Sequence, residues 1–135
     1  MALTVSRAYI SVSLRQSVVK RAGNSCEYCL TNDLISVHKF HIDHIYNEAK
    51  GGPTSLDNLA YACAVCNHKK GENLAGYIAE IGQAFLLYHP RKDTWEDHFD
   101  LTSTGRLVLK TNVAKAAAAQ LKLNVKMLSQ SVRSS

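Results

Sequence analysis

Two Cys-x2-Cys pairs constrain the fold of this chain more than any other feature of its sequence. Cys26 pairs with Cys29 and Cys63 with Cys66, and these are the four cysteines of the chain. The N-terminus lacks the unbroken apolar run of a secretory signal peptide, so we expect a cytoplasmic protein whose thiols stay reduced. In such a protein, paired Cys-x2-Cys elements form one tetrahedral zinc site more often than disulfides. The sequence therefore predicts a structural Zn²⁺ bound by all four cysteines.

The separation of the two pairs indicates what lies between them. Positions 30–62 hold 33 residues, more than the roughly 15 to 20 that separate the pairs of a compact zinc finger. We therefore expect an inserted structural unit between two zinc-binding turns. With 135 residues, 46% of them hydrophobic, the chain can bury a core of its own, and we expect a single domain over residues 1–135. No apolar run is long enough to span a membrane.

The remaining pattern predicts helices mixed with short strands, an α+β fold. The predicted strands are residues 34–45 and 59–63, followed later by a hairpin over residues 100–110. The predicted helices are residues 13–23, beginning with a capping box at Ser13, and residues 64–74, 75–87 and 112–128. Trp95 and Phe99 are predicted core residues, whereas Glu27 and Tyr28, between the first two cysteines, are predicted to face outward.

The inserted unit carries closely spaced polar residues. Asp43 and His44 are adjacent in the first predicted strand, so their side chains should point to opposite faces. Asn58 follows a loop marked by two glycines, and Asn67 and Lys70 share one face of the helix predicted after Cys63. Each residue alone is more often structural than functional. Together, at this spacing, they favour an enzyme.

These motifs resemble the HNH endonuclease family, whose shared unit is the ββα-metal finger. The matching motifs are Asp43-His44-Ile45, Gly51-Gly52, Asp57-Asn58-Leu59 and Cys63-x2-Cys66-Asn67-x2-Lys70-Gly71, preceded by a first cysteine turn in residues 21–29. The third namesake residue is His in some members of the family, whereas here that position is Asn67. The resemblance implies a ββα-metal finger stapled by the four-cysteine zinc site. Its core would span about residues 13–76, and residues 77–135 would form an extension with added helices and a C-terminal hairpin.

The resemblance also implies a metal-dependent endonuclease that hydrolyses phosphodiester bonds in DNA. His44 would be the general base, Asp43 and Asn67 would hold a catalytic Mg²⁺ or Mn²⁺, and Asn58 would fix the His44 ring through backbone hydrogen bonds. Lys70 would contact a substrate phosphate. Residues 101–135 carry six Lys or Arg and no Asp or Glu, which suits contact with a polyanion. We expect no small-molecule cofactor and no membrane partner.

Two other classes stay open at this point. One is a zinc-stabilised DNA-binding module without cleavage activity, which would keep the cysteines and the basic C-terminal residues. The other is a redox or interaction protein, which would need Cys-x2-Cys thiols free of metal. Assembly is open as well: one metal finger cuts one strand, and a homodimer would be needed to cut both strands at once. The chain is compatible with a monomer or a homodimer.

Overall fold

A computed structural model describes residues 9–123 of the chain. The chain divides into two compact units, Met1–Asn67 and His68–Ser135. The described part combines helices with three antiparallel two-stranded sheets, which confirms the predicted α+β class. Within residues 9–123, no helix is both long and apolar enough to cross a bilayer. The single domain over residues 1–135 stays a prediction.

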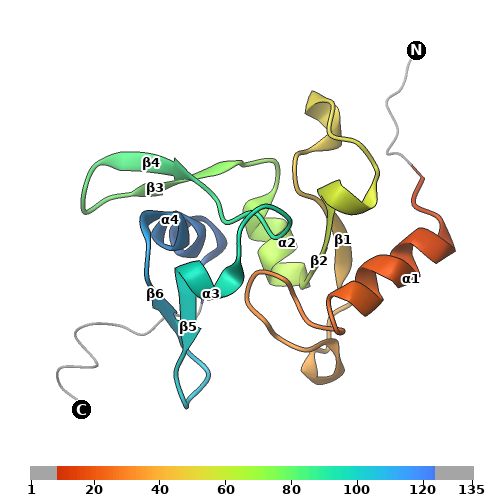
Figure 1. The fold of residues 1–135 in the computed structure, drawn as a ribbon, viewed down its shortest axis with the longest axis horizontal. Coiled ribbons are helices and arrows are strands. Elements are labelled where there is room, and N and C mark those ends of the chain that lie inside the picture. The colour runs from red at the N-terminus through yellow and green to blue at the C-terminus, as the bar shows by residue number, and fades with distance from the viewer. Residues whose placement is uncertain (1–8, 124–135) are drawn as a thin grey trace. The chain divides into compact units, whose positions relative to one another are not determined.

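The first unit is built on a small sheet (Figure 1). Strand β1 (His41–His44) pairs antiparallel with β2 (Leu59–Ala62), and all four residues of β2 are buried. Helix α1 (Val12–Arg21) packs against β2, and α2 (Ala64–Lys70) follows β2 in the chain. The order β1, β2, α2 is the predicted ββα arrangement. Three short 3-10 helices complete the unit: η2 (Asp33–Ile35), η3 (Glu48–Lys50) and η4 (Leu56–Asn58).

Helix α1 begins two residues earlier than the predicted capping box. The hydroxyl of Ser11, not Ser13, caps the helix by accepting a hydrogen bond from the Leu14 amide at 3.1 Å. At the other end, Arg21 donates to two backbone carbonyl oxygens, that of Leu56 at 2.7 Å and that of Leu59 at 2.5 Å. Arg21 thus ties the end of α1 to the segment that contains Asn58.

The strand predicted over residues 34–45 is wrong except for its last part. Only β1 is strand, because pairing exists only where the four residues of β2 lie opposite it. Upstream, the Asn32 side chain accepts from the Leu34 amide at 2.9 Å and starts a turn of 3-10 helix instead. Ile35 and Val37 are exposed there, so their β-branched side chains do not indicate a buried strand.

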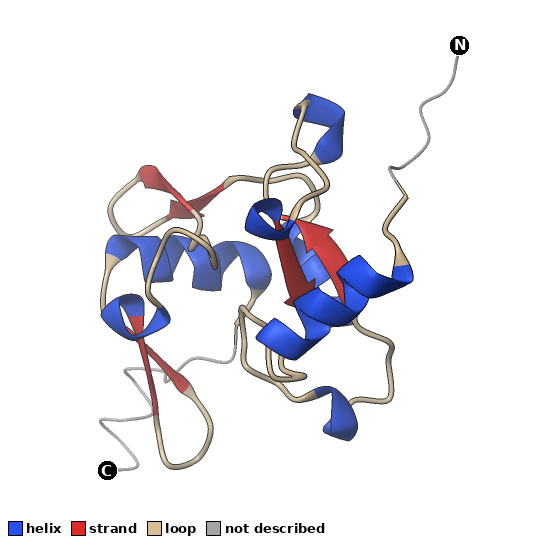
Figure 2. Cartoon of the chain, turned by 45° about the vertical axis from the view of Figure 1, so that its right-hand side comes forward, coloured by secondary structure: helices blue, strands red, loops and turns tan. Residues whose placement is uncertain are grey.

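The described part of the second unit contains two hairpins, the short helix α3 and the longer helix α4 (Figure 2). Helix α4 packs against the first hairpin and against β6 of the second. The elements are β3 (Ala75–Ile78), β4 (Gln83–Leu86), α3 (Trp95–His98), β5 (Phe99–Leu101), β6 (Leu107–Leu109) and α4 (Asn112–Leu121). The hairpin predicted over residues 100–110 is confirmed by β5 and β6. Phe99 is buried as predicted, and Trp95 stacks on it with ring centroids 5.3 Å apart.

The helix predicted over residues 75–87 is wrong, because this segment forms the β3–β4 hairpin. Its glycines explain the difference. A Cβ at position 76 would lie 2.1 Å from the Ala116 carbonyl oxygen, so Gly76 allows the strand to approach α4. Gly82 adopts a left-handed conformation (φ +62°) in the turn. The apolar residues 75–87 therefore form a hairpin that packs against helix α4 instead of forming a helix themselves.

Two predicted helices are shorter than expected. Helix α2 ends at Lys70, before Gly71 at φ +52°, rather than at residue 74. Helix α4 ends at Leu121, where Lys122 adopts the left-handed conformation. The predicted continuation over residues 124–128 lies outside the described part.

Candidate active site and four-cysteine centre

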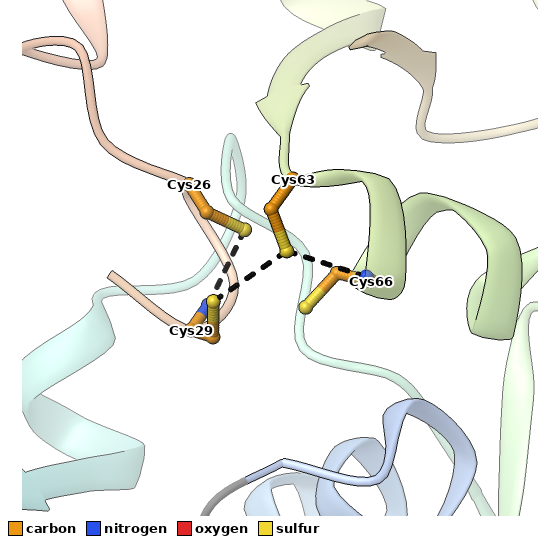
Figure 3. Close-up of side chains that lie close together, drawn as sticks. All are labelled: Cys26, Cys29, Cys63 and Cys66. Carbon is orange, nitrogen blue, oxygen red and sulfur yellow. Dashed lines mark hydrogen bonds between the residues drawn. The ribbon is translucent and has the colours of Figure 1, made fainter. Parts of the chain in front are cut away.

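The four cysteines converge on one point of the first unit (Figure 3). Their sulfur atoms all lie within 4.8 Å of one another, and the Cys29 and Cys63 sulfurs are 3.8 Å apart. Cys26 and Cys29 come from the turn after α1, Cys63 follows β2, and Cys66 lies in α2. Backbone amides point at the sulfurs: the Cys29 amide lies 3.5 Å from Cys26 Sγ, and the Cys66 amide lies 3.4 Å from Cys63 Sγ.

This geometry fits a structural zinc ion. Tetrahedral coordination with Zn–S bonds of about 2.3 Å places ligand sulfurs about 3.8 Å apart. Hydrogen bonds among the four thiols lower the pKa of Cys29 and Cys63 and raise the pKa of Cys26 and Cys66, because the shared protons stay on the latter two sulfurs. A bound cation favours the thiolate form of all four cysteines. Four thiolates this close would repel one another without a cation between them. The cluster is therefore compatible with the predicted zinc site.

Asp43 is buried and receives a hydrogen bond from a tyrosine. The Tyr28 hydroxyl donates to Asp43 Oδ2 at 2.7 Å, and the two residues are 1% and 6% exposed. Burial, reinforced by the charge of Asp43, raises the pKa of the Tyr28 phenol well above its usual value, so the phenol is a donor at neutral pH. The prediction that Tyr28 faces outward is wrong. Glu27 is half-buried, and its carboxylate accepts from the Tyr61 amide at 2.9 Å.

His44 lies beside Asp43 but meets a different partner. Its Nε2 is 2.9 Å from the hydroxyl of Thr54, a half-buried residue in the loop between β1 and β2. Successive strand residues point to opposite faces, and the separate partners of Asp43 and His44 follow this alternation.

Asn58 fastens the loop that carries Thr54. Its side-chain oxygen accepts from the Tyr46 amide at 2.9 Å, and its side-chain nitrogen donates to the carbonyl oxygens of Tyr46 at 3.0 Å and Pro53 at 2.8 Å. Asn58 therefore bonds backbone on both sides of this loop, directly before Thr54 and two residues after His44. A Cβ at position 52 would lie 1.8 Å from the Tyr46 carbonyl oxygen, so the loop closes only with Gly52.

Asn67 and Lys70 lie on α2, one helical turn apart. Asn67 is half-buried and follows Cys66 directly. Lys70 is 2% exposed. A phosphate contact by Lys70 stays a prediction, and it requires the ammonium group to become accessible. His41 and His68, which flank the site in sequence, are exposed.

Tyr28 and Thr54 were not predicted as parts of the site. Tyr28 lies in the turn between Cys26 and Cys29, where the sequence indicates only the cysteines. Thr54 follows Gly51, Gly52 and Pro53 in a segment whose composition predicts a loop and nothing more. Their partners, Asp43 and His44, are 15 and 10 residues away along the chain. Motif spacing carries no signal for either contact.

Comparison with known families identifies the class of this site. Residues 26–73 match the sequence model of the HNH endonuclease family. They contain the four cysteines together with Asp43, His44, Asn58 and Asn67. This match confirms, over residues 26–73, the resemblance to the HNH endonuclease family that the motifs predicted, and it indicates a nuclease or DNA-binding function. No curated protein and no solved structure gave a significant match.

Proposed function

We propose that this protein is a metal-dependent endonuclease that hydrolyses phosphodiester bonds in DNA. One observation carries the proposal. Within the residues that match the HNH endonuclease family, Asp43 and His44 are neighbours in β1, and Asn58 fastens the loop that brings Thr54 to His44. A buried network of this kind orients two potentially reactive side chains, which a purely structural zinc module does not need.

In this mechanism His44 is the general base. Its Nε2 faces the Thr54 hydroxyl at 2.9 Å. If Nε2 carries the proton and donates to that hydroxyl, the proton-accepting lone pair is on Nδ1. His44 then takes a proton from the attacking water, while Asn58 keeps the loop and the ring in place.

Asp43 and Asn67 would hold Mg²⁺ or Mn²⁺. A carboxylate and an amide oxygen are the hard donors that these ions prefer. When bound, the ion stabilises negative charge on the phosphoryl and leaving oxygens. Asp43 is ordered by Tyr28, and Asn67 is carried by α2 directly after the zinc ligand Cys66. The zinc ion and the catalytic ion would thus occupy different sites.

The proposal extends to partners and location. DNA is the expected substrate, Lys70 is the proposed phosphate contact, and the cations of residues 101–135 would favour approach of the polyanion. A chain acting as a monomer would nick one strand, and a homodimer would cut both. Four cysteines poised for metal suit the cytoplasm, where thiols stay reduced.

A plasmid-cleavage assay tests both the nuclease activity and the role of His44 as general base. Supercoiled plasmid is incubated with the zinc-loaded protein and Mg²⁺ or Mn²⁺, and the products are resolved on a gel. We expect nicked or linear DNA with the added cation and none in excess EDTA. His44→Ala should reduce the rate at least about 100-fold, since a general base typically contributes that much.

His41→Ala is the matched control, because His41 is an exposed histidine in the same strand. It should cleave like the wild type. Full cleavage in excess chelator would contradict the metal mechanism, and unchanged cleavage by folded His44→Ala would remove the assigned base. DNA binding without cleavage by the wild type would favour the DNA-binding module instead.

A further inference from the structure

Tyr28 links the first zinc-binding turn to the proposed metal ligand Asp43. It lies between Cys26 and Cys29, and its backbone amide points at Cys26 Sγ at 3.4 Å. Its hydroxyl reaches Asp43 Oδ2 at 2.7 Å. One residue therefore touches both a zinc ligand, through its backbone, and Asp43, through its side chain.

The neighbouring residue Glu27 fixes this turn against the sheet. The Glu27 amide donates to the Tyr61 carbonyl oxygen at 2.9 Å, and the Glu27 carboxylate accepts from the Tyr61 amide at 2.9 Å. The turn is thus bonded to β2 directly before Tyr28. In the sheet register, Ala60 of β2 lies opposite Asp43, and its small side chain adds little bulk on the face that Asp43 occupies. The backbone of Tyr28 is therefore held beside β2 by its neighbour Glu27, and its side chain extends from there to Asp43 on β1.

We propose that Tyr28 is a positioning residue that sets the orientation of the Asp43 carboxylate for a divalent cation. This inference rests on the proposed function, in which Asp43 is a metal ligand. The second side-chain torsion of aspartate is soft, so an unrestrained carboxylate rotates about it. The hydrogen bond from Tyr28 to Oδ2 restricts this rotation and so orients Oδ1 as well. Groups that hold metal ligands in this way typically change metal affinity about 10-fold to 100-fold when they are removed.

Tyr28→Phe is the test, because it removes the hydroxyl and keeps the ring that fills the buried position. Binding of Mn²⁺ to the zinc-loaded protein is measured by isothermal titration calorimetry in the absence of DNA. We expect Tyr28→Phe to bind Mn²⁺ about 10-fold more weakly than the wild type, with one zinc per chain retained. A similar increase should appear in the Mn²⁺ concentration that half-activates plasmid cleavage.

Tyr61→Phe is the matched control. Tyr61 is also a buried tyrosine of the first unit whose hydroxyl donates to an aspartate, Asp33 Oδ2, at 2.7 Å. Removing the Tyr61 hydroxyl should leave Mn²⁺ affinity unchanged. If loss of a buried hydroxyl weakened Mn²⁺ binding by destabilising the whole unit, Tyr61→Phe would weaken it as well.

The possible failures are distinguishable. If the wild type binds Mn²⁺ and cleaves DNA but Tyr28→Phe binds Mn²⁺ equally well, the positioning role is wrong and the proposed function stands. Equal weakening in Tyr28→Phe and Tyr61→Phe would also overturn the positioning role, because the effect would then belong to the unit as a whole. If the wild type neither binds Mn²⁺ nor cleaves DNA, the proposed function fails and the inference fails with it.

Discussion

At the scale of single residues, the site is ordered by hydrogen bonds that cross between segments. Asn58 uses both atoms of its amide group on the backbone of Tyr46 and Pro53. These bonds fix the path of the loop on both sides, and the next residue after Pro53 is the one that meets His44. We therefore expect the amide of Asn58 to orient His44 through Thr54.

Thr54→Val tests this connection. Valine has nearly the same shape as threonine but lacks the hydroxyl that lies 2.9 Å from His44 Nε2. Because the imidazole loses this hydrogen bond, we expect about a 10-fold lower single-turnover rate of plasmid cleavage. The melting temperature should change little.

Thr104→Val serves as the control. Thr104 is an exposed threonine in the turn between β5 and β6, where its hydroxyl meets only that of Thr102. Its removal should not affect the rate. A Thr54→Val rate equal to that of wild type would show that His44 is oriented without the hydroxyl.

Some residues of the candidate site could be predicted from the sequence, and others could not. The sequence predicted a zinc site at the four cysteines, because ligand type and paired spacing are sufficient signals, and their sulfurs do converge. It also predicted that the Asp43 and His44 side chains point to opposite faces, because neighbouring residues of a strand do so. It did not predict Tyr28 or Thr54 as partners. Both contacts depend on how distant segments are brought together, which no local pattern encodes.

At the scale of elements, period and composition identified the ββα unit but not all its neighbours. Residues 59–62 form the predicted strand because they are buried on both sides. Residues 34–40 are also apolar and β-branched in part yet form no strand, since within residues 9–123 no partner strand lies beside them. The apolar composition of residues 75–87 predicted a helix. Instead, Gly76 allows β3 to pack closely on α4, and Gly82 forms the turn between β3 and β4. Strand or helix was decided here by tertiary contacts.

Gly76→Ala tests the close approach in the second unit. The added Cβ would lie 2.1 Å from the Ala116 carbonyl oxygen, and this obstacle is helix backbone that cannot rotate away. We expect a loss of about 3 kcal/mol in the free energy of unfolding, at the upper end for an overpacked site. Urea denaturation followed by circular dichroism measures it.

Gly105→Ala provides the comparison in the same unit. Open space surrounds a Cβ at position 105, so only the left-handed backbone (φ +83°) opposes the change. The cost there should be about 1 kcal/mol. If Gly76→Ala were no more destabilising than Gly105→Ala, the close packing of β3 on α4 would not be limited by the side chain at position 76.

At the scale of the whole molecule, the four cysteines of the candidate zinc site belong to one unit. All four cysteines lie in Met1–Asn67, together with Asp43, His44, Asn58 and Asn67. The second unit has its own buried residues, among them Phe99, Leu107 and Leu121. The first unit buries apolar residues as well, among them Val18, Phe40 and Leu59, and it holds the four-cysteine cluster in addition. A zinc ion bound by the four cysteines would add to the stability of the first unit.

Removal of zinc should consequently unfold the first unit before the second. Structural Zn²⁺ sites contribute about 10 to 16 kcal/mol of binding free energy, which equals or exceeds the total stability of a typical domain, about 5 to 15 kcal/mol. We predict that Cys63→Ser binds no zinc and that the amides of β1 and β2 lose protection in hydrogen exchange. The amides of β3, β4 and α4 should keep more of their protection.

Ala64→Ser is the control, because it introduces the same residue one position away and leaves all four thiols. It should retain one zinc per chain and wild-type protection. Equal loss of protection across both units in Cys63→Ser would mean that the zinc site stabilises the chain as one cooperative body.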